Sequence, residues 1–132
     1  MITRIEANRY RCLENIGIGI PQYAVLVGAN GAGKTTLMDI PRLVGDCLKH
    51  RNITDAFTQK LQGRSARCST LKELVYCSLG NEFFLAIEAS LPEGTVRELI
   101  EGLPAAQRDE TSWPTTIRYE LQIGRASCRE RV

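Results

Sequence analysis

The chain has 132 residues, 43% of them apolar and 24% charged, with a net charge of +2, which is the balance of one ordinary globular domain. No uninterrupted apolar stretch approaches the length of a membrane-spanning helix, and the charged N-terminus excludes a signal peptide. The sequence therefore predicts a cytoplasmic protein that is not inserted in a membrane.

Metal binding by thiolate or imidazole groups is also disfavoured. The chain has one histidine, and its five cysteines (Cys12, Cys47, Cys68, Cys77 and Cys128) form no C-x-x-C pair. Zinc sites need clustered ligands at defined spacing. We therefore expect the cysteines to be reduced and buried as small apolar side chains.

Two strands open the chain. Residues 2–9 alternate loosely, and residues 13–20 place alternate isoleucines on one face until Pro21, which cannot donate to a ladder. The short apolar run at 23–27 then predicts a further strand, covered on both faces. A helix should begin at Gly33. Because the ring of Pro41 clashes with the carbonyl of the preceding turn, we expect a kink or an early stop near Ile40 and a resumed helix to about His50.

The remaining elements are shorter. The pattern predicts helices at 53–61 and 71–77, a strand at 82–91, a turn at 92–94, a weak helix at 96–103, a loop at 104–114 and a strand at 115–123. This order predicts an α/β fold with a mixed sheet, in which antiparallel strands surround the helix that follows Gly33.

A phosphate-binding loop connects the apolar run to this helix. Residues 28–35 fit G-x-x-x-x-G-K-[ST] without a gap. Glycines let the backbone curl with positive φ, so that successive N–H groups and the start of the helix face an anion. The candidate binding residues are Gly28, Ala29, Asn30, Gly31, Ala32, Gly33, Lys34, Thr35 and Thr36.

Three side chains of this loop have predicted roles. Lys34 would reach the β- and γ-phosphates, and the hydroxyl of Thr35 would ligate Mg²⁺, which makes these two the candidate catalytic residues. Thr36 is placed to meet the α-phosphate. ATP and Mg²⁺ are therefore the expected ligands.

The wider sequence resembles the N-terminal lobe of ATPases of the ATP-binding-cassette class. It is most similar to the AAA-family ATP-binding proteins related to SMC and RecF heads and to OLD-type nucleases. The resemblance is carried by Arg9-Tyr10-Arg11-Cys12-Leu13, which matches an N-[FY]-R-x-[FL] segment, and by residues 28–37, which match G-x-N-G-x-G-K-[ST]-T-L. It implies a P-loop NTPase lobe that dimerises through its ATPase head, with nucleic acid as a further partner. It also makes Arg11 a candidate nucleotide contact, although a solvated arginine on an edge strand is an equally good interpretation.

Two motifs that this class needs for hydrolysis are missing. The resemblance implies an apolar strand ending in Asp-Glu and a Ser-Gly-Gly signature, and both belong to the C-terminal lobe. The nearest acidic candidate, Glu88, has no preceding aspartate and lies in an alternating strand. The sequence thus predicts residues 1–122 to be an incomplete lobe that binds ATP without hydrolysing it.

The last ten residues are expected to have a different origin. Residues 123–132, I-G-R-A-S-C-R-E-R-V, resemble the translation of a common sequencing adapter, so we expect a non-native tail. Without the tail, Lys+Arg falls from 17 to 14 and Asp+Glu from 15 to 14, so the net charge falls from +2 to 0. The basic balance is therefore no argument for nucleic acid.

Three other functions fit the loop. A membrane-transporter ATPase subunit is disfavoured because residues 42–58 are helical and polar where a turn and a strand are usual. A small-molecule kinase is disfavoured because Asn30-Gly31 and Thr36-Leu37 fit the cassette pattern better. A nucleotide-binding module without turnover stays open. We favour an ATPase of DNA repair or phage defence.

Overall fold

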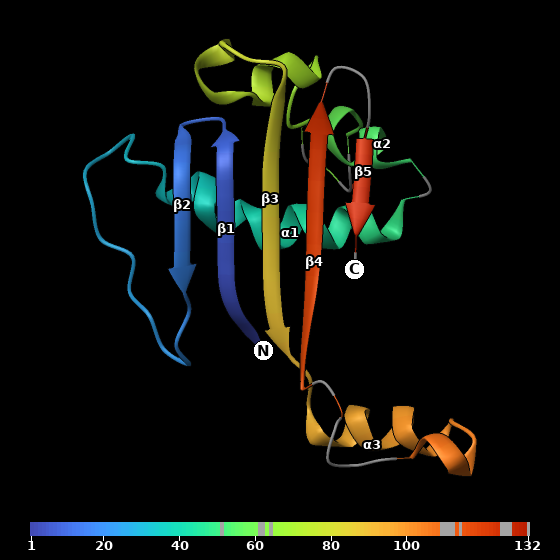
Figure 1. Cartoon of the computed structure of the whole chain (residues 1–132). Helices are drawn as coiled ribbons and strands as arrows, with labels where there is room; N and C mark the ends of the chain where they lie inside the picture. The colour runs from blue at the N-terminus through green and yellow to red at the C-terminus, as the bar shows by residue number, and fades with distance from the viewer. Residues whose placement is uncertain are drawn as a thin grey trace.

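A computed structural model of the chain describes residues 1–50, 52–60, 63, 65–108, 113 and 115–124, together with the backbone of 128–131. The described residues form one sheet with the strand order β2-β1-β3-β4-β5, in which every neighbouring pair is antiparallel (Figure 1). The strands are β1 (Ile2–Tyr10), β2 (Leu13–Gly19), β3 (Glu82–Ser90), β4 (Thr116–Gly124) and β5 (Cys128–Arg131). The α/β class is confirmed, whereas the sheet is antiparallel and not mixed.

One long helix covers one face of this sheet. Helix α1 (Lys34–Lys49) lies across the strands, and its apolar stripe of Leu37, Ile40, Leu43, Val44 and Cys47 is buried (Figure 1). Alternate residues of the strands pack against this stripe. They point to the same face because side chains along a strand alternate with a period of two. They are Ile5 and Ala7 in β1, Phe83, Leu85 and Ile87 in β3, and Tyr119, Leu121 and Ile123 in β4. This packing forms the core.

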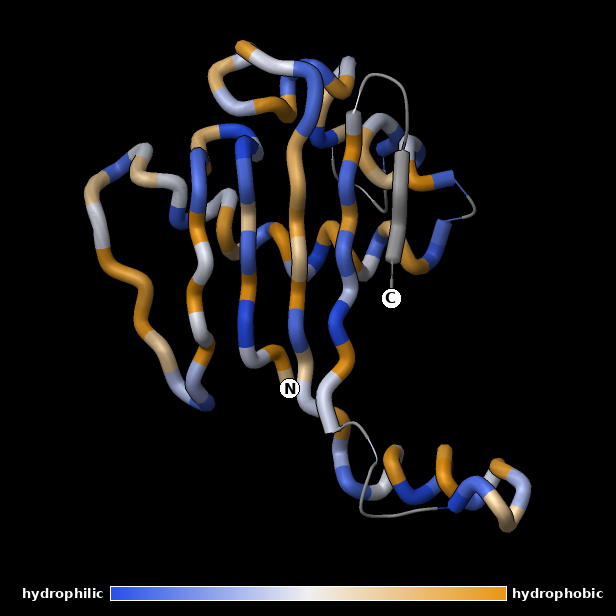
Figure 2. The backbone as a smooth tube through the Cα atoms, viewed as in Figure 1, coloured by the Kyte–Doolittle hydropathy of each residue, from blue (hydrophilic) through white to orange (hydrophobic). Residues whose placement is uncertain are grey.

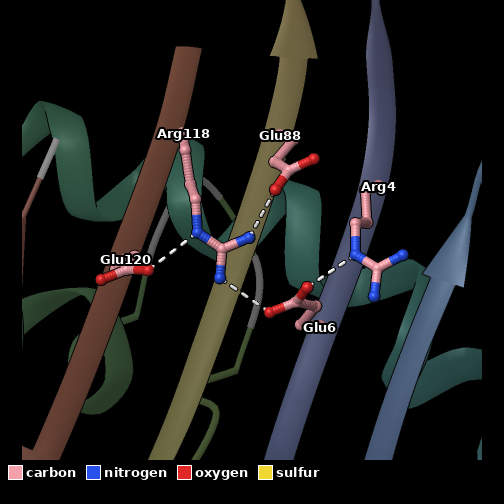
Figure 3. A network of polar contacts seen from close by, with 5 residues as sticks. All are labelled: Arg4, Glu6, Glu88, Arg118 and Glu120. Carbon is pink, nitrogen blue, oxygen red and sulfur yellow. Dashed lines mark hydrogen bonds and ion pairs between the residues drawn. The ribbon is translucent and has the colours of Figure 1, made fainter. Parts of the chain in front are cut away.

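In the part of the chain that the structure describes, the face of the sheet opposite α1 carries an ion-pair network and no helix. The guanidinium of Arg118 on β4 contacts carboxylates on three strands, at 2.7 Å from Glu6 on β1, 2.6 Å from Glu88 on β3 and 2.8 Å from Glu120 on β4 (Figure 3). Glu6 also accepts from Nε of Arg4 at 2.6 Å. Because Arg118 reaches across β3, it links three neighbouring strands on the face that no core covers.

A second arginine fastens the segment after α1. Arg67 lies 3.0 Å from Asp39 and 2.7 Å from Asp46, both on α1, and its Nη1 donates to the carbonyl of Ala56 at 2.9 Å. Ala56 belongs to α2 (Ile53–Thr58), which packs Phe57 against Phe83 of β3. The predicted helix at 53–61 is confirmed but ends earlier. The one at 71–77 consists of two short 3-10 turns, η1 (Leu71–Leu74) and η2 (Tyr76–Ser78).

The predicted buried strand at 23–27 is wrong. This stretch forms no strand, and its side chains are exposed: Tyr23 by 83%, Val25 by 69%, Leu26 by 43% and Val27 by 86%. Its backbone makes no hydrogen bond with any described residue. Figure 2 shows it as an orange segment beside β2, apart from the sheet. The stretch is apolar as expected, but it forms no ladder with the edge strand β2.

The expected helix up to about His50 is confirmed, whereas the early stop considered near Ile40 does not occur. The helix runs from Lys34 to Lys49 with Pro41 inside it. Proline removes one intrahelical hydrogen bond. Ile40 and Leu43, on either side of it, are fully buried against the sheet, and this packing holds the helix together across the missing bond.

Between β3 and β4 the chain makes a separate helical excursion. The expected turn at 92–94 is wrong, because α3 (Glu93–Glu101) begins there with Pro92 at its N-cap, a position where a missing N–H costs little. The helix lies beyond the end of the sheet and buries none of its residues (Figure 1). A 3-10 turn, η3 (Ala105–Gln107), follows inside the expected loop, of which residues 109–112 and 114 lie outside the described residues.

The cysteines divide into two kinds. Cys47 and Cys68 are buried as expected, whereas Cys12 and Cys77 are exposed, so the prediction fails for that pair. The side chain of Cys128 lies outside the described residues. Among the helices that the structure describes, none has the length and apolarity to cross a membrane.

The outer network predicts acid sensitivity. Hydrogen bonds from Arg118 and then Arg4 lower the pKa of Glu6 from 4.5 to about 2. Because the folded-state pKa lies below that of the unfolded chain, the stabilisation is complete above pH 4.5 and is lost as the pH falls towards 2. Thermal unfolding of wild type and Glu6→Gln should therefore give melting temperatures that differ at pH 6 and converge below pH 3. Glu93→Gln, on α3, is the matched control and should show no such convergence. A constant difference for Glu6→Gln would contradict the role assigned to this carboxylate.

Candidate functional site

The predicted phosphate loop is an exposed turn at the start of α1. Its residues 28–32 are exposed, and the turn is closed by a bond from the N–H of Ala32 to the carbonyl of Ala29 at 3.2 Å. Gly31 and Gly33 have φ of +83° and +89°, the left-handed conformation that glycine adopts without a steric penalty. These two glycines therefore sit where the loop requires them, and they turn the chain into the helix.

The end of α1 at this loop is electrostatically suited to an anion. Its N-cap is Gly33, which has no side chain to cap the first turn, and that turn contains no acidic residue. The first N–H groups of a helix lack intrahelical partners and carry the positive end of the helix dipole. An anion placed at this end would thus meet free donors and no competing carboxylate of the first turn.

Lys34 is folded back over the loop. Its Nζ donates to the carbonyls of Gly28 and Ala29, each at 2.6 Å. The ammonium group therefore lies above the same turn whose N–H groups would face a phosphate. Thr35 is exposed, and Thr36 is half-buried and accepts a hydrogen bond from the thiol of Cys12 at 3.5 Å.

The turn between β1 and β2 packs directly on the start of α1. A Cβ at Gly33 would lie 2.9 Å from Cδ2 of Leu13 and 3.2 Å from Sγ of Cys12. Leu13 is 3% exposed, so it has little room to give way. Glycine is thus required at position 33 for two reasons, its φ and the close approach of this turn.

Arg11 lies in the same turn but has an internal partner. Its Nη2 donates to the carbonyl of Arg67 at 2.6 Å, and its guanidinium carbon lies 5.9 Å from the centre of the Tyr10 ring. Its backbone N–H donates to the carbonyl of Leu74 at 2.7 Å. Arg11 therefore lies near the loop because the next residue, Cys12, contacts Thr36. Its own side chain is held by the hydrogen bond to Arg67.

Two features of this neighbourhood were not predicted. For the contact of Cys12 with Thr36, the only indication in the sequence is the position of Cys12 in the N-terminal motif. The ion pairs of Arg67 join it to Asp39 and Asp46, 28 and 21 positions away, and no local pattern predicts them. Glu88, the nearest acidic candidate for a hydrolytic motif, is paired with Arg118 on the outer face and not with the loop. Among the described residues no cluster of three or more potential ligands could hold a metal ion by itself.

The chain was compared with known proteins by sequence and by fold. No protein-family model matches the chain. A stretch of 47 residues is 40% identical to an OLD nuclease of Thermus scotoductus, which corresponds to 35% of this chain and 9% of the nuclease. A solved structure from work on the ATP-driven dimerization and DNA-stimulated activation of SMC ATPases matches 98% of this chain and 69% of its own, with a TM-score of 0.53 and 16% identity. The fold is therefore similar to that of an SMC-type ATPase domain, and the chain spans a small part of the matching nuclease.

Glycine substitutions test the loop geometry. Gly33→Ala places a methyl group at a strained φ and against Leu13, so we expect a loss of about 1–3 kcal/mol in the free energy of unfolding. Gly31→Ala has the same kind of φ but open space around it, and should lose less. Gly45→Ala, inside α1 with no atom within 4 Å of the added Cβ, should gain roughly 0.5–1 kcal/mol. Urea denaturation measures all three, and equal stability of Gly33→Ala and wild type would contradict this geometry.

Proposed function

We propose that the chain binds ATP with Mg²⁺ through residues 28–36, as part of an ATPase related to SMC proteins and OLD nucleases. The observation that carries the proposal is the geometry of the loop. Two glycines in the left-handed conformation precede the start of α1, which has no side-chain cap, and the ammonium group of Lys34 lies over the same turn. The fold similarity to an SMC-type ATPase domain supports the same assignment.

The proposed roles follow from the chemistry of the side chains. The backbone from Gly28 to Gly33 would accept the phosphates on its N–H groups. Lys34 would exchange its bonds to the two loop carbonyls for bonds to the β- and γ-phosphates, because an ammonium group pairs better with an anion than with neutral carbonyls. The hydroxyl of Thr35 would ligate Mg²⁺, and Thr36 would face the α-phosphate. Arg11 is proposed as a contact at the edge of the site.

We further propose that residues 1–122 are the N-terminal lobe of a larger ATPase domain and that 123–132 are a foreign tail. The exposed run at 23–27 supports this view, because its residues are apolar on both alternating sides and their backbone groups are unpaired. Such a strand is stable only within a sheet that is covered on both faces. The pairing of β5 with β4 is compatible with a foreign segment, since ladder bonds join backbones and not side chains.

The larger protein is proposed to be cytoplasmic, to dimerise through this ATPase domain and to act on nucleic acid in repair or phage defence. The residues that activate water would lie in its second lobe. The chain described here would accordingly hold the nucleotide without cleaving it, since neither Glu88 nor Glu6 is available next to the loop: both are ion-paired to Arg118 on the opposite face.

Titration with Mg·ATP tests the binding site. Lys34→Ala should weaken binding by at least about tenfold, or 1.4 kcal/mol, because it removes the only side-chain cation of the loop. Lys49→Ala, an exposed lysine in the last turn of the same helix, is the control and should bind like wild type. Equal affinity of Lys34→Ala and wild type would refute the site.

Phosphate release measured in the same samples tests the missing second lobe. We expect no turnover above the background of the Lys34→Ala variant. A robust rate that Lys34→Ala abolishes would show that this chain already contains the residues that orient water.

A further inference from the structure

Arg67 occupies a position that its distance along the chain from the phosphate loop does not suggest. Its side chain is only 12% exposed and bridges two carboxylates on α1, Asp39 at 3.0 Å and Asp46 at 2.7 Å. These aspartates are seven residues apart, which places them two turns apart on one face of the helix. Nη1 also donates to Ala56, so three separate points fix one guanidinium. Arg67 is thus rigidly attached to the helix that carries the loop.

The backbone of Arg67 holds a second element. Its carbonyl accepts the 2.6 Å bond from Nη2 of Arg11, while its N–H donates to the carbonyl of Phe57 at 2.9 Å. Arg11 belongs to the turn whose next residue, Cys12, touches Thr36. The contacts therefore form a closed circuit, from the start of α1 to the β1–β2 turn, on to Arg67, and back to α1 through Asp39.

We propose that Arg67 is a positioning residue for the phosphate loop. Its side chain is ion-paired to α1, and its carbonyl accepts a hydrogen bond from Arg11. Together these contacts hold the β1–β2 turn against the first turn of the helix. Because the circuit is closed, cutting it at Arg67 frees Arg11 and lets the turn move away from Gly33 and Thr36. The site for the phosphates would then lose one of its walls. The effect on nucleotide affinity rests on the proposed function, whereas the effect on the start of α1 does not.

The chain offers a matched control for this idea. Arg118 likewise pairs with several carboxylates, three where Arg67 has two, but it is 33% exposed and lies on the opposite face of the sheet. Arg67→Ala and Arg118→Ala should both lower the melting temperature, since each removes a network of ion pairs. Only Arg67→Ala should alter the loop. A purely structural role for Arg67 predicts no such difference.

Amide hydrogen exchange without nucleotide provides the first readout. In the N-terminal turns of α1, where the N–H of Leu37 bonds to the carbonyl of Gly33 at 2.9 Å, exchange should accelerate in Arg67→Ala by at least about tenfold relative to Arg118→Ala. Equal exchange at the start of α1 in both variants would overturn the proposal.

Mg·ATP titration provides the second readout. Arg67→Ala should raise the Kd about tenfold, and Arg67→Lys about threefold, because a single ammonium group cannot reproduce the planar fork that reaches two aspartates. Arg118→Ala should leave the Kd within about twofold of wild type. A Kd unchanged by Arg67→Ala would refute the positioning role. Failure of wild type itself to bind Mg·ATP would refute the proposed function, and the exchange experiment would still decide the role of Arg67. Arg67→Lys keeps a cation in the network, and it supports the same comparison if Arg67→Ala does not fold.

Discussion

The rest of the structure depends on how α1 is seated on the antiparallel sheet. A helix is stiff, so burying Ile40 and Leu43 at its middle also fixes the place and direction of its N-terminal end. That end meets the β1–β2 turn, and the contact is so close that only glycine fits at position 33. The location of the candidate phosphate site therefore follows from apolar packing that is remote from any phosphate chemistry. Polar contacts then adjust a geometry that the core has already fixed.

Two arginines stabilise opposite faces of the molecule, with different consequences. Arg118 joins β1, β3 and β4 where water reaches the charges, so its bonds are screened and contribute little individually. Arg67 lies between α1 and α2, where its pairing with two aspartates outweighs the cost of burying the cation and raises its pKa. The buried Tyr10 ring lies beneath the Arg11 guanidinium, and burial raises the pKa of the Tyr10 hydroxyl to about 12. The charged groups on the helix side therefore contact the elements that form the candidate site, whereas those on the outer face join the strands of the sheet.

Local patterns predicted what local forces decide. Alternation located β1, β2, β3 and β4 to within a few residues, because it records which side of a strand faces a core. The glycine pattern located the turn before α1 for a similar reason, since φ is a property of single residues. The stop considered at Pro41 does not occur, because packing that the local pattern does not weigh offsets the lost hydrogen bond. The pairing of Arg67 with Asp39 and that of Arg118 with Glu6 escaped prediction, since they join residues 28 and 112 positions apart.

The run at 23–27 shows how a correct pattern can yield a wrong structure. Its composition demands burial on two faces and a partner on each edge, and the described residues supply neither. The candidate phosphate loop therefore has one fixed end, at the helix, and one end whose backbone makes no hydrogen bond with the described residues. If the loop binds a triphosphate as proposed, closing it would require the ordering of residues that precede Gly28, which would cost conformational entropy and subtract from the affinity. A second sheet that paired with this run would remove that cost before the nucleotide arrives. The loop would then owe its affinity as much to the strand before it as to the glycines and the lysine within it.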